Sequence, residues 1–174
     1  MANSGGILSL WNKSLSKLIF PFAEEGFIDV CLECGPLAKR CFVVNVYSKC
    51  DLAAKKRWSA NFLTAKFGLG EGVWCIVGGF NAVCRGDERR GVNEVGNDGH
   101  RREMRLFKEF LEEVELEDLN PLGRKFTWYH TNGVAMSRID RTLVSENWVN
   151  ACGIPFLWVL HRDVINSWTS KLHW

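Results

Sequence analysis

Long hydrophobic runs are missing from this chain, because no apolar stretch approaches the ~20 residues that a helix needs to cross a bilayer. The first residues have no charged leader and no cleavage-site pattern, so we expect neither a secretory signal nor a membrane role. A strong charge of one sign is missing as well. The formal net charge is +2, which demands no polyanionic partner, although local basic clusters can still meet phosphates.

A dense cysteine framework is also missing. The seven cysteines are an odd number and are scattered, which favours a reduced intracellular setting, nuclear or cytoplasmic, over a secreted one. Cys31 and Cys34 have the spacing of half a zinc site, but Cys41 and Cys50 stand alone and no histidine pair follows at ligand spacing. A structural metal and free thiols both remain open interpretations. We predict free thiols and no metal site.

The composition is that of a globular domain. The chain has 174 residues, 47% of them hydrophobic and 24% charged, which suffices for one domain with a sizeable core. Eight tryptophans are many for this length, and we expect most of them to pack rather than bind. Nothing in the sequence indicates an obligate oligomer.

The stretch from Val73 to Val83 is the feature around which the other elements are expected to gather. Its first part is continuous, rich in β-branched and aromatic residues and too short for a helix, which predicts a buried strand. Gly78 and Gly79 then permit backbone geometry that other residues resist, and Asn81 follows. Functional residues commonly lie where a central strand ends. The alternative is a core strand followed by an ordinary turn.

Strands and helices are expected on both sides of this stretch, with Asp51, Asp98 and Ser145 as helix N-caps. Residues 84–97 are polar and rich in glycine, which predicts a surface loop. Hydrophobic periodicity predicts strands at 7–11, 26–32, 41–47, 73–77, 123–129, 137–144 and 154–160, and helices at 51–67, 98–114 and 145–148.

The segment from Ser137 to Val144 is expected to form a hairpin with the strand before it. Alternation along this segment places Arg138, Asp140 and Thr142 on one face. Asp140 therefore shares a face with a basic neighbour, and an ordinary ion pair is one interpretation of that arrangement.

Several short phrases occur in order along the chain: Ser4-Gly5-Gly6-Ile7-Leu8 with Trp11, Val44-Asn45-Val46-Tyr47-Ser48, Trp74-Cys75-Ile76-Val77-Gly78 with Phe80-Asn81-Ala82-Val83, Glu88-Arg89-Arg90-Gly91, Glu117-Asp118-Leu119, Gly123-Arg124-Lys125-Phe126-Thr127-Trp128 and Ser137-Arg138-Ile139-Asp140-Arg141. Together they resemble the endonuclease/exonuclease/phosphatase family, in the form that heads LINE-type (non-LTR) retrotransposon polyproteins of plants. The phrases cover most of the chain.

This resemblance implies an α/β (α+β) fold, here an incomplete four-layer sandwich of two facing mixed β-sheets with helices outside. It also implies Mg²⁺-dependent hydrolysis of a DNA phosphodiester, by a domain that is followed by a reverse transcriptase in the same polyprotein. Such chemistry needs carboxylates for the cation, a base that activates water, and donors for the charge that develops on phosphate.

Transferred residue by residue, the family's site is incomplete in this chain. Tyr47 matches the family tyrosine, although it could instead be a core residue with a hydroxyl tip. Asn81 matches the phosphate-contacting asparagine, and Asp140 matches the supporting aspartate. Gly79 stands where the family has an aspartate. We expect the strand with the metal-binding glutamate upstream of residue 1. No histidine follows Arg162-Asp163-Val164 where the late aspartate-histidine pair is expected.

We therefore expect residues 1–174 to be one partial, degenerate domain, a pseudoenzyme that binds no Mg²⁺. The alternative function is a non-catalytic remnant that binds DNA weakly through Arg124, Lys125, Trp128 and Arg138. A third interpretation is a decayed product whose exposed sheet edges favour aggregation.

Overall fold

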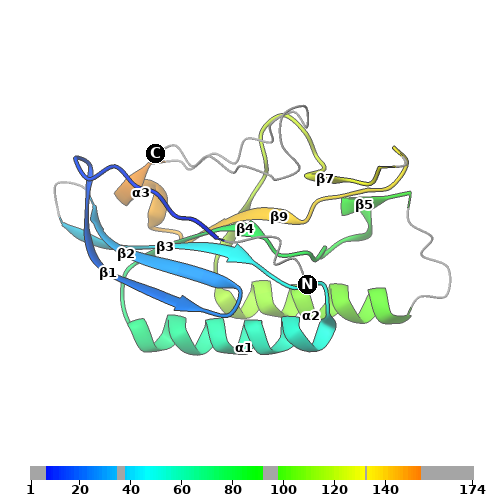
Figure 1. Cartoon of the computed structure of the whole chain (residues 1–174), viewed down its shortest axis with the longest axis horizontal. Coiled ribbons are helices and arrows are strands. Elements are labelled where there is room, and N and C mark those ends of the chain that lie inside the picture. Colours follow the sequence, from blue (N-terminus) through cyan, green and yellow to red (C-terminus); the bar gives the residue numbers. More distant parts are fainter. Residues whose placement is uncertain (1–6, 35–37, 92–97, 132, 154–174) are drawn as a thin grey trace, which may run out of the picture.

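The computed structural model describes residues 7–34, 38–91, 98–131 and 133–153, which form two β-sheets and three α-helices (Figure 1). The large sheet has the strand order β1-β2-β3-β4-β9-β6, and a small antiparallel sheet has the order β5-β8-β7. The predicted α/β class, with two sheets and helices outside, is confirmed. The strands are β1 (Ser16–Glu24), β2 (Phe27–Cys34), β3 (Lys39–Tyr47), β4 (Val73–Gly79), β5 (Arg89–Arg90), β6 (Glu117–Leu119), β7 (Trp128–Tyr129), β8 (Met136–Ser137) and β9 (Asp140–Val144).

The strand β4 lies inside the large sheet, as predicted. It runs parallel to β3 and antiparallel to β9, and the parallel pair is connected through helix α1 (Leu52–Leu69). The residues from Val73 to Gly78 are all buried, because α1 and α2 (Asp98–Val114) cover one face of the sheet and α3 (Trp148–Cys152) lies on the opposite face (Figure 1). Coverage on both faces explains why the strand has a continuous apolar run.

The core under α1 and α2 is aromatic. Trp58 and Phe62 of α1 stack with ring centroids 5.8 Å apart, and both contact Phe110 of α2. The expected apolar face of α2 is confirmed, because Phe107, Phe110 and Val114 are buried. Burial of side chains of this size stabilises a fold by about 1.5–3 kcal/mol each.

The structure confirms one of the three predicted helix N-caps. Asp51 Oδ1 accepts a hydrogen bond from Ala54 N at 2.8 Å, so it caps α1 as predicted, although the helix continues past Gly68. Asp98 lies within the first turn of α2. Ser145 is not a helix cap, because its Oγ accepts from Trp74 N at 3.0 Å and so extends the pairing of β4 with β9.

The first predicted strand was wrong. Residues 7–11 have no regular structure, whereas β1 forms the edge of the large sheet and contains Pro21. An edge strand tolerates proline because one side of its backbone has no strand to pair with. The hairpin of β2 and β3 is confirmed, with Phe27 opposite Val46 and Cys34 opposite Lys39.

Two further predictions need correction. The segment predicted as one strand from Ser137 to Val144 is divided between β8 in the small sheet and β9 in the large sheet. The polar stretch that begins at residue 84 is not wholly a surface loop, because Glu88 ends a short 3₁₀ helix (Gly86–Glu88) and is fully buried. The predicted strand at 154–160 lies outside the described residues. None of the described helices is long and apolar enough to cross a membrane.

Candidate functional site

Tyr47, Gly79 and Asp140 form one row across the ends of three neighbouring strands. Tyr47 at the end of β3 is opposite Gly79 at the end of β4, and Gly79 is opposite Asp140 at the start of β9. Strand alternation directs this row to the face away from α1 and α2, because Val44 and Leu143, three residues from Tyr47 and Asp140 respectively, pack in the core under those helices. Tyr47 is 59% exposed, so its phenol is accessible rather than a core residue.

The two glycines at the end of β4 have different reasons to be glycine. Gly78 has a φ of +134°, and a Cβ there would lie 2.1 Å from the carbonyl oxygen of Val46, so no other residue fits. A Cβ on Gly79 would meet Asp140 Oδ1 at 3.2 Å and Tyr47 Cδ2 at 3.7 Å, contacts that small shifts can relieve. The backbone therefore permits a side chain at position 79, and that side chain would point at Asp140.

Asn81 lies at the same end of the sheet. Its backbone has a φ of +51°, a left-handed conformation that asparagine tolerates better than most residues. Its Nδ2 donates to the carbonyl oxygen of Ser48 at 2.5 Å, and its own carbonyl oxygen accepts from Lys55 Nζ at 2.5 Å. These contacts attach Asn81 to the residue after Tyr47, so the structure brings together the predicted positions 47, 79, 81 and 140.

Among the residues that the structure describes, Asp140 has no basic partner. Thr127 Oγ1 accepts hydrogen bonds from the backbone N–H groups of Ile139 and Asp140, both at 3.0 Å. Asp140 Oδ2 is buried and has no hydrogen-bond partner among the described residues. Burial raises the pKa of Asp140, and interaction with Thr127 lowers it to a smaller extent. The expectation that Asp140 shares a face with Arg138 is wrong, because the chain passes from β8 to β9 between them.

Arg138 belongs instead to a buried ion cluster with Arg141, Glu88 and Asp118. The guanidinium of Arg138 bonds to Glu88 Oε1 at 3.2 Å and to Asp118 Oδ1 at 2.7 Å. Arg141 bonds to Glu88 Oε2 at 2.6 Å and to Asp118 Oδ2 at 2.5 Å. Arg138 is only 3% exposed and Arg141 is fully buried, so neither can contact nucleic acid at the surface. Arg138 was therefore wrongly assigned to a DNA-binding face.

The other predicted nucleic-acid residues lie at or next to the small sheet. Arg124 and Lys125 are exposed, and Trp128 is half-buried. Lys125 Nζ is 2.9 Å from Asp87 Oδ2, so part of its charge is neutralised. Arg124 lies over the ring of Tyr129 at 6.0 Å. Each exposed basic group thus lies near an aromatic ring other than that of Trp128, since Lys125 lies over the ring of Phe126.

The residues at this site do not fit a Mg²⁺ ion. Magnesium prefers near-octahedral oxygen ligands and usually takes more than one carboxylate from the protein or phosphate from the substrate. Of the four positions brought together, only Asp140 has a carboxylate, and one of its two oxygens, Oδ2, is buried. Within the described residues, the group of potential ligands close enough to share an ion consists of three cysteines elsewhere in the fold.

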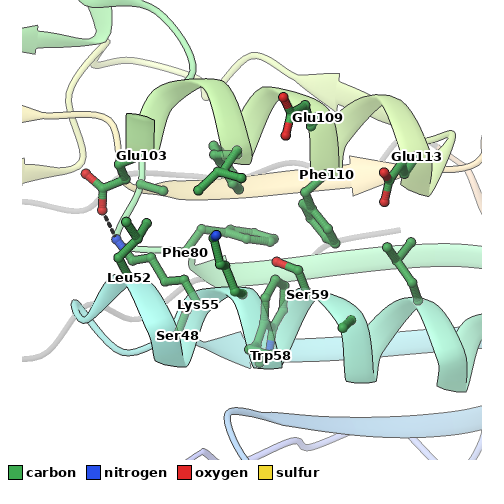
Figure 2. A pocket seen from close by; sticks show the side chains of 16 residues that line it. Ser48, Leu52, Lys55, Trp58, Ser59, Phe80, Glu103, Glu109, Phe110 and Glu113 are labelled. Carbon is green, nitrogen blue, oxygen red and sulfur yellow. Dashed lines mark hydrogen bonds and ion pairs between the residues drawn. The ribbon is translucent and has the colours of Figure 1, made fainter. Parts of the chain in front are cut away.

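A pocket of about 360 Å³ lies between α1 and α2, on the opposite face of the sheet from the row of Tyr47, Gly79 and Asp140. Figure 2 shows Lys55 and Glu103 joined by an ion pair at one end, with Phe80 and Phe110 in the lining. None of the predicted site residues lines it. Ser48 and Lys55 in its lining both hydrogen-bond to Asn81, so the pocket adjoins the candidate site from the other face of the sheet.

Comparison with known proteins supplies the family. A model of the Endonuclease/Exonuclease/phosphatase family matches residues 3–170, and the chain therefore belongs to this family. Comparison with curated proteins gives no significant match.

Solved structures with the same fold include a retrotransposon endonuclease. The endonuclease domain of TRAS1, a telomere-specific non-LTR retrotransposon, has 15% identity and a TM-score of 0.56 over 78% of this chain and 58% of its own. The 3′ phosphatase NExo from Neisseria, bound to a product DNA hairpin, has 19% identity and a TM-score of 0.57 over 86% of this chain and 65% of its own. The human Nocturnin catalytic domain has 14% identity and a TM-score of 0.50, and the chain spans 50% of its length.

Proposed function

We propose that this chain is a retrotransposon-type endonuclease domain that no longer hydrolyses phosphodiesters. The observation that carries the proposal is Gly79, which places a hydrogen atom between Tyr47 and Asp140 where the chemistry needs a second carboxylate. Gly78 must be glycine for the backbone to fit, whereas Gly79 need not be. A missing side chain at position 79 is therefore a loss of chemistry that the fold does not require.

The remaining groups are too few for the reaction. Burial raises the pKa of Asp140 and so disfavours the charged form that would bind a cation. Tyr47 and Asn81 can donate hydrogen bonds to phosphate, but neither can deprotonate water. Loss of a single preorganised electrostatic group typically lowers a rate by about 10²–10³-fold. Loss of the cation site and the base together is expected to leave no measurable turnover.

Nicking of supercoiled plasmid DNA in the presence of Mg²⁺ tests this proposal. The wild-type chain should give the same background as the variants Asn81→Ala and Asp140→Asn. Mg²⁺-dependent nicking by the wild type that either variant abolishes would contradict it. Nicking that survives in both variants would show that the cleavage does not come from the site described above.

Non-catalytic DNA binding is the second candidate, and the small sheet favours it. Arg90 in β5, Met136 in β8 and Tyr129 in β7 are in register, so their side chains share one face. Arg124 lies over the Tyr129 ring on this sheet, and Arg90 is exposed. An aromatic ring that shares a sheet face with basic side chains is suited to combine base stacking with phosphate contacts.

Fluorescence polarisation with a labelled single-stranded oligonucleotide tests the second candidate. Each phosphate contact contributes about 0.7 to the slope of log K against log salt for a single strand, so the double variant Arg90→Ala/Arg124→Ala should lower that slope by about 1.4. Arg105→Ala, an exposed arginine on α2, is the matched control and should leave the slope unchanged. Salt-independent binding, or equal slopes for all three proteins, would exclude this face as a DNA-binding surface.

We also propose that the chain descends from a LINE-type element of plants and that it functions inside the cell. The supporting observations are the fold shared with the TRAS1 endonuclease domain and the seven cysteines, all of which are free thiols.

A further inference from the structure

Three cysteines from distant parts of the chain meet on the face of the large sheet that α3 covers. Cys34 ends β2, Cys41 lies near the start of β3, and Cys152 ends α3. Their sulfur atoms all lie within 4.8 Å of one another, and the Sγ atoms of Cys41 and Cys152 are 3.2 Å apart. Two of the three are buried and Cys152 is half-buried, so the cluster has one side near solvent.

The C-x-x-C spacing of Cys31 and Cys34 does not produce this cluster. Residues three apart on a strand point to opposite faces, and Cys31 packs in the core under α1 while Cys34 packs on the other side of the sheet. The partners of Cys34 are instead the two cysteines that the folding of β3 and α3 brings to it.

We propose that Cys34, Cys41 and Cys152 form a binding site for a thiophilic metal ion, with Zn²⁺ as the reference ligand. Zinc–sulfur bonds are about 2.3 Å long, which places two thiolates on one tetrahedral ion about 3.8 Å apart. The observed sulfur separations, from 3.2 Å to below 4.8 Å, bracket this value. Changes of less than about 1 Å in these separations would thus suffice to bind the ion.

The surroundings of the three sulfurs are compatible with metal binding. Ser16 Oγ lies 3.6 Å from Cys34 Sγ and supplies a polar neighbour of the kind that supports metal ligands. On binding, Zn²⁺ would replace the thiol protons of its cysteine ligands, and these protons would be released.

The consequence of the site is structural. The ion would connect α3 to the hairpin of β2 and β3, which are far apart in sequence. A metal that binds the folded chain but not the unfolded one stabilises the fold by mass action. This site lies on a different part of the sheet from Gly79 and does not depend on the proposed loss of catalysis.

Titration of the reduced full-length chain with Co²⁺, followed by displacement with Zn²⁺, tests the site. We expect a thiolate-to-cobalt charge-transfer absorption that saturates at a single equivalent and disappears when Zn²⁺ is added. Replacing any of the three cysteines by alanine should weaken Zn²⁺ binding by more than about tenfold, since changes even one shell further out have effects of that size. Cys31→Ala is the matched control, because it removes a buried thiol from the same strand, and it should leave the affinity unchanged.

A second measurement needs no variant and so does not depend on whether the alanine variants fold. Bound Zn²⁺ should protect Cys34, Cys41 and Cys152 of the wild-type chain from alkylation, while the exposed Cys50 reacts at the same rate with and without the ion. Absence of a charge-transfer band, or equal alkylation of the three cysteines with and without Zn²⁺, would overturn the proposal. A disulfide between Cys41 and Cys152 that forms in air while the reduced chain binds no metal would overturn it as well.

Discussion

Replacement of Glu88 by glutamine should destabilise the fold more than almost any other change of one charge. Glu88 and Arg141 are both fully buried, and Glu88 bonds to the guanidinium groups of Arg138 and Arg141 at 2.6–3.2 Å. With Asp118 the cluster contains two positive and two negative charges. Glu88→Gln keeps the shape of the side chain but leaves two buried guanidinium groups with one carboxylate.

The expected loss follows from two independent estimates. Breaking a buried ion pair by removal of one partner typically costs about 3–5 kcal/mol. Burial alone would raise the pKa of Glu88, but the hydrogen bond and charge of Arg141 outweigh it and lower the pKa from 4.5 to about 2. At about 1.36 kcal/mol for each pKa unit, this difference corresponds to about 3 kcal/mol. The two values agree, and they are a large part of the total stability of a domain of this size.

Urea unfolding at two pH values measures the effect. Because the pKa of Glu88 is lower in the folded chain, its contribution is complete above pH 4.5 and is lost as the pH falls from 4.5 towards 2. The wild type should therefore lose about 3 kcal/mol of unfolding free energy over this range through Glu88, and Glu88→Gln should lack that loss. Glu112→Gln, an exposed glutamate paired with Lys108, is the control and should change stability by no more than about 0.5 kcal/mol. A Glu88→Gln variant as stable as this control at pH 7 would refute the reasoning.

Two further changes have defined outcomes. Burial raises the pKa of Asp29 from 3.8 to about 7, so the folded chain keeps a proton that the unfolded chain releases, and the unfolding free energy should fall as the pH rises from about 4 to 7. Asp29→Asn should abolish that fall and, in urea unfolding at pH 8, should be up to about 4 kcal/mol more stable than the wild type. Parallel curves of stability against pH for the two proteins would contradict this assignment. Gly79→Asp places a second carboxylate beside Asp140, so this variant should have a lower melting temperature than the wild type in the absence of metal. Mg²⁺ should raise the melting temperature of Gly79→Asp but not that of the neutral control Gly79→Asn. Equal responses of the two variants to Mg²⁺ would be the contrary result.

Local patterns predicted the parts of the fold that depend on neighbouring residues. The run from Val73 to Val77 and the positions of Gly78 and Asn81 were enough to predict a buried strand that ends at a candidate site, because continuous apolar character and glycine at a strand end are local signals. The pairing of Tyr47, Gly79 and Asp140 came from family resemblance, since nothing in the spacing of these residues indicates that three strands align them.

Long-range pairing could not be predicted. Uninterrupted alternation placed Arg138 beside Asp140, but the change of sheet between β8 and β9 turns Arg138 to Glu88, which is 50 residues away in the sequence. Glu88 itself lies in a polar stretch, and the two buried arginines that pair with it come from 50 and 53 residues further along the chain. The only sequence signal for this cluster was that its four members occur in three of the phrases that carry the family resemblance.

The cluster of cysteines also depends on long-range pairing and could not be predicted from the sequence. Spacing suggested Cys31 and Cys34 as a pair, but spacing in a strand places them on opposite faces, and the cluster with Cys41 and Cys152 requires the hairpin and α3 to be in place. The edge strand β1 was missed because Pro21 is unfavourable inside a sheet, and only the position of β1 at the edge makes it acceptable.

Single-turnover hydrolysis tests the central claim most directly. A labelled DNA duplex is incubated with an excess of the folded wild-type chain and Mg²⁺, and the product is compared with that of Asp140→Asn over the same time. If Gly79 marks a lost carboxylate, the two proteins should give the same background at every Mg²⁺ concentration. Product that accumulates with Mg²⁺ in the wild type and is absent with Asp140→Asn would contradict the account.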